Sequence, residues 1–146
     1  MPAARTAAPV DVTSTAAELS VVAAQLIRRL RTESAFPAHQ LMVLGRLDRE
    51  GPRTTSRLAI SERVRPQSMA ATVADLVTAE LVTRRPDPED GRQVLLELTD
   101  EGRTVLERER RARTAWLAAA IGAELDEADR AVLDQALVLV RRLLDR

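Results

Sequence analysis

The sequence contains no cysteine, no lysine and no tyrosine, and it has a single histidine, His39. A chain without cysteine has no disulfides, no zinc bound by thiolates and no thiol that could sense an oxidant. One histidine is too few for a histidine metal site, so we expect neither a metal nor another cofactor. The two aromatic residues, Phe36 and Trp116, amount to 1% of the chain. That scarcity excludes proteins that stack single-stranded nucleic acid on aromatic rings.

Charge and hydrophobic patterning remove further classes. The 22 basic and 22 acidic residues give a net charge of zero, so any contact with nucleic acid depends on where charges lie. Every basic residue is arginine, which suits planar contacts with phosphate and guanine, although a GC-rich coding bias explains the choice more simply. No apolar run approaches the roughly 20 residues that a membrane span requires, and the N-terminus lacks a signal-peptide pattern. We therefore expect a cytoplasmic protein with no membrane partner.

The length of 146 residues, 45% of them hydrophobic, predicts one compact folded unit. Residues 1–12 are mostly small, include prolines and show no periodicity, which is typical of a mobile tail. Apolar residues at helical spacing predict a helix over 13–34, capped by Ser14 or Thr15, and a second helix over 37–50. These two helices are expected to serve in dimerisation and support.

Residues 51–99 carry the pattern of a helix-turn-helix. Hydroxyl side chains at 54–56 can cap a short helix in which Leu58 and Ala59 face inward, and Pro66 opens a second helix. The apolar positions of that second helix define a buried face made of Met69, Val73, Leu76 and Val77. Two short helices joined by a tight turn predict a helix-turn-helix.

A β-hairpin is predicted directly after these helices. Two β-compatible runs, 81–85 and 94–98, are joined by an acidic loop that contains proline and glycine. A hairpin appended to a helix-turn-helix is a wing. The predicted fold class is therefore mostly α with a small β-hairpin wing.

Residues 100–146 are expected to form two further helices. Thr99 caps a long helix whose charged run, 107–113, reads as a solvated segment, followed by Trp116 at a helix junction. Asp126 caps a last helix with an apolar stripe too wide for a lone surface helix. We predict a homodimer interface made of Leu19, Leu26, Leu133, Leu137, Val140 and Leu144.

The hairpin and the order of elements, over residues 15–146, resemble the MarR family of winged-helix transcription regulators, named for multiple antibiotic resistance. The most specific pieces are the Asp-Gly-Arg at 90–92, the Leu-Thr and Glu-Gly that follow within 98–102, and the segment 81–88. Segments 55–59 and 64–69 support the resemblance. The chain departs from the family pattern at Glu80, where a glycine is common, and at positions 70 and 71, where alanines replace the common threonine and arginine.

The resemblance implies a homodimer that binds a pseudo-palindromic operator and regulates transcription, most simply as a repressor. It also implies release by a small organic, often phenolic, effector in a pocket that includes Phe36 and His39. The alternative for His39 is an ordinary surface histidine. The remaining partners are double-stranded DNA and a second copy of the chain.

The predicted DNA contacts divide between the wing and the second helix. Arg92 would reach the minor groove, and Asp90 would hold its guanidinium, unless Asp90 only satisfies the backbone of its own turn. Gln67 and Ser68 would face base edges in the major groove. From 53 to 65 there are four arginines and one glutamate, a local basic excess. The full predicted set is Thr54, Ser56, Arg65, Gln67, Ser68, Ala71, Thr72, Arg84, Arg85, Asp90 and Arg92.

Three alternatives compete with DNA binding. Calcium binding by the acidic loop is rejected, because Pro86 and Pro88 would occupy positions that need side-chain ligands. An enzyme is not expected, since no nucleophile, base and metal come together and exposed carboxylates in a hairpin are not desolvated. A winged-helix module that binds protein instead of DNA is favoured by Ala70, Ala71 and the neutral charge, and disfavoured by Arg92.

Overall fold

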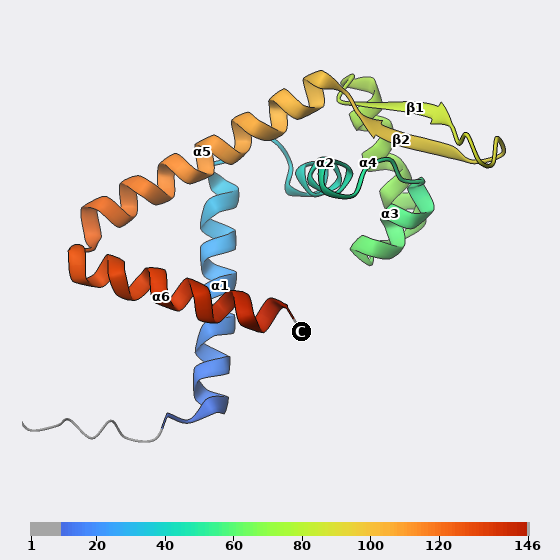
Figure 1. Cartoon of the computed structure of the whole chain (residues 1–146). Coiled ribbons are helices and arrows are strands. Elements are labelled where there is room, and N and C mark those ends of the chain that lie inside the picture. The colour runs from blue at the N-terminus through green and yellow to red at the C-terminus, as the bar shows by residue number, and fades with distance from the viewer. Residues whose placement is uncertain (1–9, 146) are drawn as a thin grey trace, which may run out of the picture. The chain divides into compact units, whose positions relative to one another are not determined.

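The computed structural model describes residues 10–145 and divides the chain into two compact units, which meet in sequence at Glu33 and Ser34. The first unit contains one helix, α1 (Val12–Thr32), and the second contains every other element. These are α2 (Ala38–Glu50), α3 (Thr55–Glu62), α4 (Pro66–Thr78), β1 (Val82–Pro86), β2 (Val94–Leu98), α5 (Asp100–Glu124) and α6 (Glu127–Leu144), as Figure 1 shows. The predicted fold class, mostly α with a two-stranded antiparallel hairpin, is confirmed.

Helix α1 starts earlier than predicted. Its N-cap is Asp11, whose carboxylate accepts hydrogen bonds from the backbone N–H groups of Thr13 and Ser14 at 3.2 Å each. The expected caps, Ser14 and Thr15, therefore lie inside the helix, because an aspartate in extended backbone is at least as good a cap as a hydroxyl. The predicted tail, residues 1–12, overlaps the start of α1 at Val12. The part of that prediction that covers residues 1–9 lies outside the described residues.

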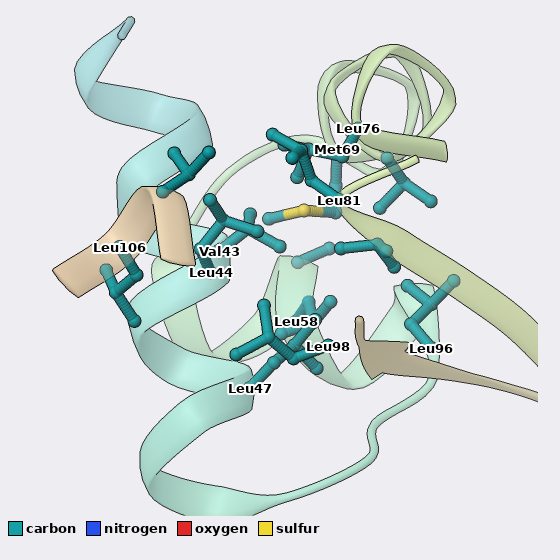
Figure 2. Close-up of a cluster of buried hydrophobic side chains, with 14 residues drawn as sticks. Val43, Leu44, Leu47, Leu58, Met69, Leu76, Leu81, Leu96, Leu98 and Leu106 are labelled. Atoms are coloured by element: carbon teal, nitrogen blue, oxygen red, sulfur yellow. The ribbon is translucent and has the colours of Figure 1, made fainter. Parts of the chain in front are cut away.

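A cluster of buried apolar side chains holds α2, α3, α4, the hairpin and the start of α5 together (Figure 2). Leu58 and Ala59 of α3 face this core, as predicted. So do three of the four residues predicted for α4, while the fourth, Val77, is half-buried against it. Between residues 10 and 145, no helix has the length and hydropathy needed to cross a membrane.

Two turns of this fold use left-handed backbone at residues other than glycine. Helix α3 ends at Arg63, with φ 52°, and the chain after α4 turns at Glu80, with φ 61°. At the second turn, the Leu81 N–H donates to the Leu76 carbonyl at 3.0 Å, so the helix closes normally without the common glycine. Such conformations cost about 1 kcal/mol or more for a residue with a Cβ.

The hairpin is joined to the core at its base and extends freely at its tip. Val82 pairs with Leu98, and the register continues to Pro86 opposite Val94. Arg53 adds a third short strand segment, because its N–H and carbonyl bond to the carbonyl and N–H of Leu96 at 3.1 and 2.8 Å. The loop between the strands, residues 87–93, therefore projects from a base that is bonded on both sides.

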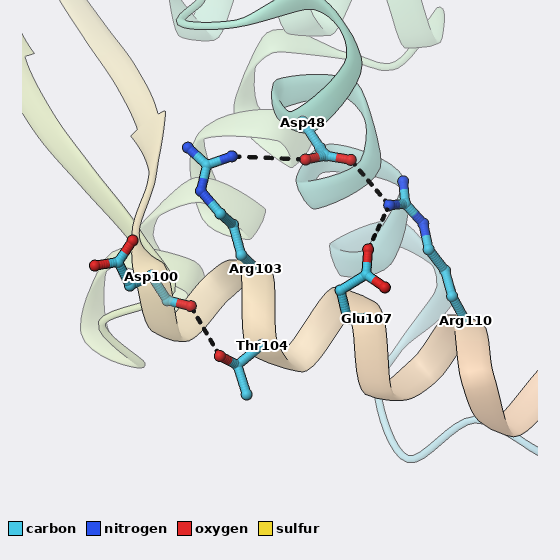
Figure 3. A network of polar contacts seen from close by, with 6 residues as sticks. All are labelled: Asp48, Asp100, Arg103, Thr104, Glu107 and Arg110. Atoms are coloured by element: carbon cyan, nitrogen blue, oxygen red, sulfur yellow. Dashed lines mark hydrogen bonds and ion pairs between the residues drawn. The ribbon is translucent and has the colours of Figure 1, made fainter.

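Helix α5 begins against Leu81, the residue before β1, and its buried residues all lie in its first ten positions. Its buried residues are Gly102, Val105, Leu106 and Glu109. Glu109 corrects the prediction that the charged run is wholly solvated, since it is only 3% exposed and accepts a hydrogen bond from the Ser34 hydroxyl at 2.5 Å. Asp48 of α2 also binds this helix, with ion pairs to Arg110 at 2.9 Å and Arg103 at 3.7 Å (Figure 3).

The approach of α5 to the Leu81 carbonyl predicts a large effect of one methyl group. A Cβ at Gly102 would lie 2.2 Å from the Leu81 carbonyl oxygen, so Gly102→Ala should lower the free energy of unfolding by about 2–3 kcal/mol. Gly122 lies in the same helix with open space around it, and Gly122→Ala should raise stability by about 0.5–1 kcal/mol. Urea denaturation at one fixed protein concentration measures both. Equal effects of the two substitutions would contradict the close approach.

Candidate nucleic-acid interface

Helix α4 presents a polar and small-residue face away from the core. Gln67 and Ser68 are exposed in its first turn, where residues of a recognition helix reach bases. Arg65 is the N-cap residue, and no side chain caps the first turn. The first backbone N–H groups are therefore left for a phosphate or for water. The rest of the exposed face consists of Ala70, Ala71, Ala74, Asp75 and Thr78.

Thr72 differs from its predicted placement on this face. It is only 8% exposed, and its hydroxyl donates to the Ser68 carbonyl at 3.0 Å. The reason is helical periodicity, because position 72 lies between the buried Met69 and Leu76 on the inner side of α4. Ala71, its neighbour in the predicted set, is exposed.

Arginines without partners lie on α3, on the turn before α4 and on the hairpin. Arg65 precedes α4, Arg84 lies on β1 and Arg92 lies in the hairpin loop. Sequence reasoning missed two more, Arg57 of α3 and Arg63 of the turn, although both belong to the basic excess it counted. All five are exposed, and within residues 10–145 their guanidinium groups make no hydrogen bond or ion pair. Their charge is therefore available to an anionic partner.

Two acidic residues close to α3, Glu50 and Glu62, are neutralised by arginines. Arg46 bonds to Glu62 at 2.6 Å and to Glu50 at 2.5 Å, and Arg53 reaches Glu50 at 3.2 Å. The hydrogen bonds to Glu50 and Glu62 raise the pKa of Arg46, and the bond from Arg46 lowers the pKa of Glu50. Because the Glu50 pKa is lowered, the ion pair of Glu50 with Arg46 stabilises the folded state at neutral pH. This stabilisation is lost as the pH falls through the pKa that Glu50 has in the folded state.

The α2 to α5 contact shows the same pattern of pairing. The hydrogen bond to Asp48 raises the pKa of Arg110, and Glu107 adds to the effect. Arg85, one of the predicted DNA contacts, bonds to Glu97 across the hairpin at 2.7 Å. Its charge is therefore shared with a carboxylate, which distinguishes it from the neighbouring Arg84. Some arginines, such as Arg85 and Arg110, therefore form ion pairs within the fold, whereas others, such as Arg84, are exposed to solvent.

The turn at the hairpin tip corrects the predicted role of Asp90. Its Oδ1 accepts a hydrogen bond from the backbone N–H of Arg92 at 3.1 Å, and its Oδ2 accepts one from the Gln93 side chain at 3.3 Å. The Gln93 N–H donates to the Asp90 carbonyl at 2.9 Å. Asp90 therefore binds the backbone of its own turn, which is the alternative given for it above. The Arg92 backbone N–H lies within reach of a turn aspartate, and Asp90 bonds to it instead of to the Arg92 guanidinium. Thr54 also acts locally, as the N-cap of α3, and Ser56 is exposed beside it.

A shallow hollow of about 380 Å³ lies between α2 and α4. His39 and Met42 line it from α2, opposite Ser68 and Ala71 of α4. Phe36 does not line the hollow. Its ring packs against the core, and the Arg108 guanidinium lies 6.0 Å from the ring centre, so the two predicted pocket residues are separated.

Four of the six predicted interface residues are exposed in this single chain. Neither α1 nor α6 contains a buried residue. In α1, Leu19 is 39% and Leu26 is 42% exposed, and in α6 Leu137 is 48% and Leu144 is 77% exposed. Leu133 and Val140 are half-buried. Each helix by itself therefore presents several exposed apolar side chains.

Comparison with known proteins identifies this architecture. The family model described as MarR family matches residues 36–94. An HTH-type transcriptional regulator of Mycobacterium bovis is 40% identical over 133 residues, 89% of this chain and 92% of the relative. The chain belongs to the MarR family. A Mycobacterium leprae HTH-type regulator is 38% identical with the same coverage.

Solved structures agree with this MarR-family assignment. A transcriptional regulator protein from Pseudomonas aeruginosa PA01 is 36% identical with a TM-score of 0.81, over 92% of this chain and 95% of that chain. A MarR family protein from Bacillus stearothermophilus shares the fold at 22% identity, with a TM-score of 0.74 over 94% and 100% of the two chains. The protein is thus a transcriptional regulator and not an enzyme.

The corrected role of Asp90 predicts different outcomes for two substitutions. Asp90→Ala removes the acceptor for the Arg92 N–H and should loosen the wing tip. Asp90→Asn keeps a side-chain oxygen acceptor while losing the charge, so its tip should stay close to the parent. Heteronuclear NOE values at the Arg92 and Gln93 amides report this order directly. If Asp90→Asn loosens the tip as much as Asp90→Ala, the carboxylate acts through its charge and the turn assignment is wrong.

Proposed function

We propose that this MarR-family regulator is a homodimer that binds a pseudo-palindromic DNA operator and represses transcription by occupying a promoter. The predicted DNA-binding set, apart from Thr72, is compatible with this function. One observation carries the proposal: five arginines without partners lie on α3, its following turn, β1 and the hairpin tip. Of the nearby acidic residues, Glu50, Glu62 and Glu97 are paired with other arginines, whereas within residues 10–145 Asp87, Glu89 and Asp90 of the hairpin loop make no ion pair. With four arginines and one glutamate, residues 53–65 of the neutral chain thus offer a locally basic surface, which is what duplex DNA requires.

The two parts of the surface suit the two grooves of DNA. The exposed face of α4, beginning with Gln67 and Ser68, has the width and position of a helix that enters the major groove. Arg92 lies in the loop that extends beyond the paired base of the hairpin, where a cation can follow the backbone into the adjacent minor groove. Arg57, Arg63 and Arg65 would face phosphates, which position the protein without reading sequence.

Dimerisation would place two such surfaces at successive grooves. The exposed apolar faces of α1 and α6 support it, because large apolar residues on helices with no buried position need a partner surface. In a two-fold dimer, each protomer would bind one half-site, with recognition helices about 34 Å apart. In the same proposal, residues 13–50 and 100–146 serve in dimerisation and support, and residues 51–99 form the winged helix-turn-helix that binds DNA.

An organic effector is the remaining part of the proposal. The hollow beside His39 shares Ser68 and Ala71 with the exposed face of α4, so a ligand seated there would compete with DNA for the same helix. Release needs a ligand whose affinity differs between the free and the DNA-bound protein. A phenolic anion, the class the resemblance implies, could bond to His39 on this surface.

A module that binds protein is the second candidate function. The net charge of zero and the alanines at 70 and 71 favour it. It would leave the unpaired arginines on the wing and the turn without a purpose. The DNA-binding variants below separate the two candidates.

Removing the wing cation should weaken operator binding and its salt dependence. Arg92→Ala should reduce affinity about ten-fold per half-site, because a hydrogen bond to a charged group contributes about 1.5 kcal/mol. It should also flatten the salt slope by up to about one counterion per half-site. Titrations of an operator, obtained by selection from random duplexes, at several salt concentrations measure both quantities.

Two other variants define what the Arg92 result means. Arg111→Ala removes the same charge from an exposed position of α5 and should leave the slope unchanged. Gln67→Ala should cost about 1–3 kcal/mol at one base pair with little change in slope. If Arg92→Ala binds the operator as tightly as the parent protein at every salt concentration, the wing does not contact DNA. That result would favour the module that binds protein.

A charge placed in the α6 stripe should break the dimer. Obligate dimers commonly bury more than about 2,000 Å² of largely apolar surface, so Leu137→Glu should yield monomers at micromolar concentration. Gln135→Glu lies on the opposite side of the same helix and should leave the dimer intact. Sedimentation equilibrium distinguishes the species. A monomeric parent protein would overturn the proposed interface.

A further inference from the structure

Helix α4 carries no basic residue at all, although it is the element with the position of a recognition helix. Its sequence runs from Pro66 to Thr78 without arginine or lysine. The commonest specific contact between proteins and DNA, an arginine or lysine that binds guanine through O6 and N7, cannot come from this helix. Whatever α4 reads in the major groove is read by other chemistry.

The centre of the exposed face of α4 is made of methyl groups. Positions 67, 70, 71, 74 and 78 recur at helical spacing and are all exposed, while Met69, Val73 and Leu76 are buried on the other side. Three of the five exposed positions are alanine. The exposed polar side chains of this face are Gln67 and Ser68 in the first turn, and Asp75 and Thr78 further along the helix.

Among the described helices this absence of basic residues is particular to α4, whose one exposed charge is Asp75. Helix α5 also has an exposed face, and there the exposed positions include Glu107, Arg108 and Arg111. A charged side chain that enters a groove loses water and needs a partner, whereas an alanine methyl loses nothing. The alanine positions of α4, 70, 71 and 74, are therefore suited to close apolar contact with base edges, and the flanking arginines supply the attraction to phosphate.

We propose that α4 reads thymine methyl groups, so that the major-groove core of each operator half-site consists of A·T pairs. This inference rests on the proposed DNA-binding function. In the major groove only thymine presents a methyl group, and alanine is one of the residues that contacts it. Gln67 complements this readout, since glutamine binds adenine through N6 and N7. Ala71 and Ala74, one turn apart behind Gln67, contact successive thymines along the groove.

Replacing thymine by deoxyuridine tests the proposal directly, because the change removes one methyl group and leaves base pairing intact. A bound duplex is first selected from random sequences. Each thymine of its half-site is then replaced by deoxyuridine, and affinity is measured by fluorescence anisotropy. We expect about a four-fold loss per half-site at one or two core positions, the factor for burying one methyl group.

A protein variant assigns the methyl contact to a residue. Ala71→Gly removes the opposing methyl, so the ratio of affinities for thymine and deoxyuridine duplexes should fall to about one at the facing position. Both affinities are measured with the same preparation of the variant. A fraction of unfolded protein therefore lowers both equally and leaves their ratio unchanged. Ala112→Gly makes the same change on the exposed face of α5 and should leave the ratio at its parental value.

The outcomes separate this proposal from the proposed function. A selected palindrome with an A·T core and a methyl dependence that Ala71→Gly abolishes supports both. A palindrome with a G·C core, or one indifferent to deoxyuridine, overturns methyl readout while sequence-specific DNA binding stands. If selection yields no preferred sequence, the proposed function fails and this inference fails with it.

Discussion

The arrangement of the wing and α4 depends on the contacts of one threonine. The Thr99 hydroxyl donates to the Glu80 carbonyl at 2.7 Å and accepts from the Gly102 N–H at 3.0 Å. Its backbone N–H donates to the Leu81 carbonyl at 3.1 Å. Thr99 thus bonds the turn after α4 and the first residue before β1 to the first turn of α5. These three hydrogen bonds act together with the buried core to hold α4, the hairpin and α5 at one junction.

The left-handed turn at Glu80 and the missing side chain of Gly102 belong to the same junction. The Glu80 conformation aims its carbonyl at Thr99, and Gly102 lets α5 approach the Leu81 carbonyl. The strain at Glu80 is tolerated because the Thr99 hydrogen bond and the Leu81 to Leu76 hydrogen bond determine the backbone there. A rigid junction matters for a DNA-binding protein, since contacts in two grooves add together only if their spacing is preset.

Sequence reasoning predicted the fold because most of its signals are local. The helical period of α4 placed Met69, Val73 and Leu76 in the core, and the turn residues between 86 and 92 marked the hairpin. It missed Asp11 as a cap because Ser14 and Thr15 are equally suitable residue types nearby. It misplaced Thr72 because a residue type favoured for DNA contact was weighed above its position on the helix. Glu109 was missed since its partner, Ser34, is 75 residues away.

The candidate site was less predictable than the fold for a related reason. Composition counts arginines but does not show which of them are paired, and pairing decides which charges an operator can use. Arg46, Arg53, Arg85 and Arg110 are occupied by carboxylates that the fold brings close. A protein of zero net charge can therefore bind an anion where carboxylates are used internally and arginines such as Arg63 and Arg92 are left exposed. Because salt screens exposed charges over about a Debye length, the local arginines of a chain with zero net charge act on an anion mainly at close range. Such a protein gains affinity from correct docking more than from general attraction, which favours discrimination between an operator and other DNA.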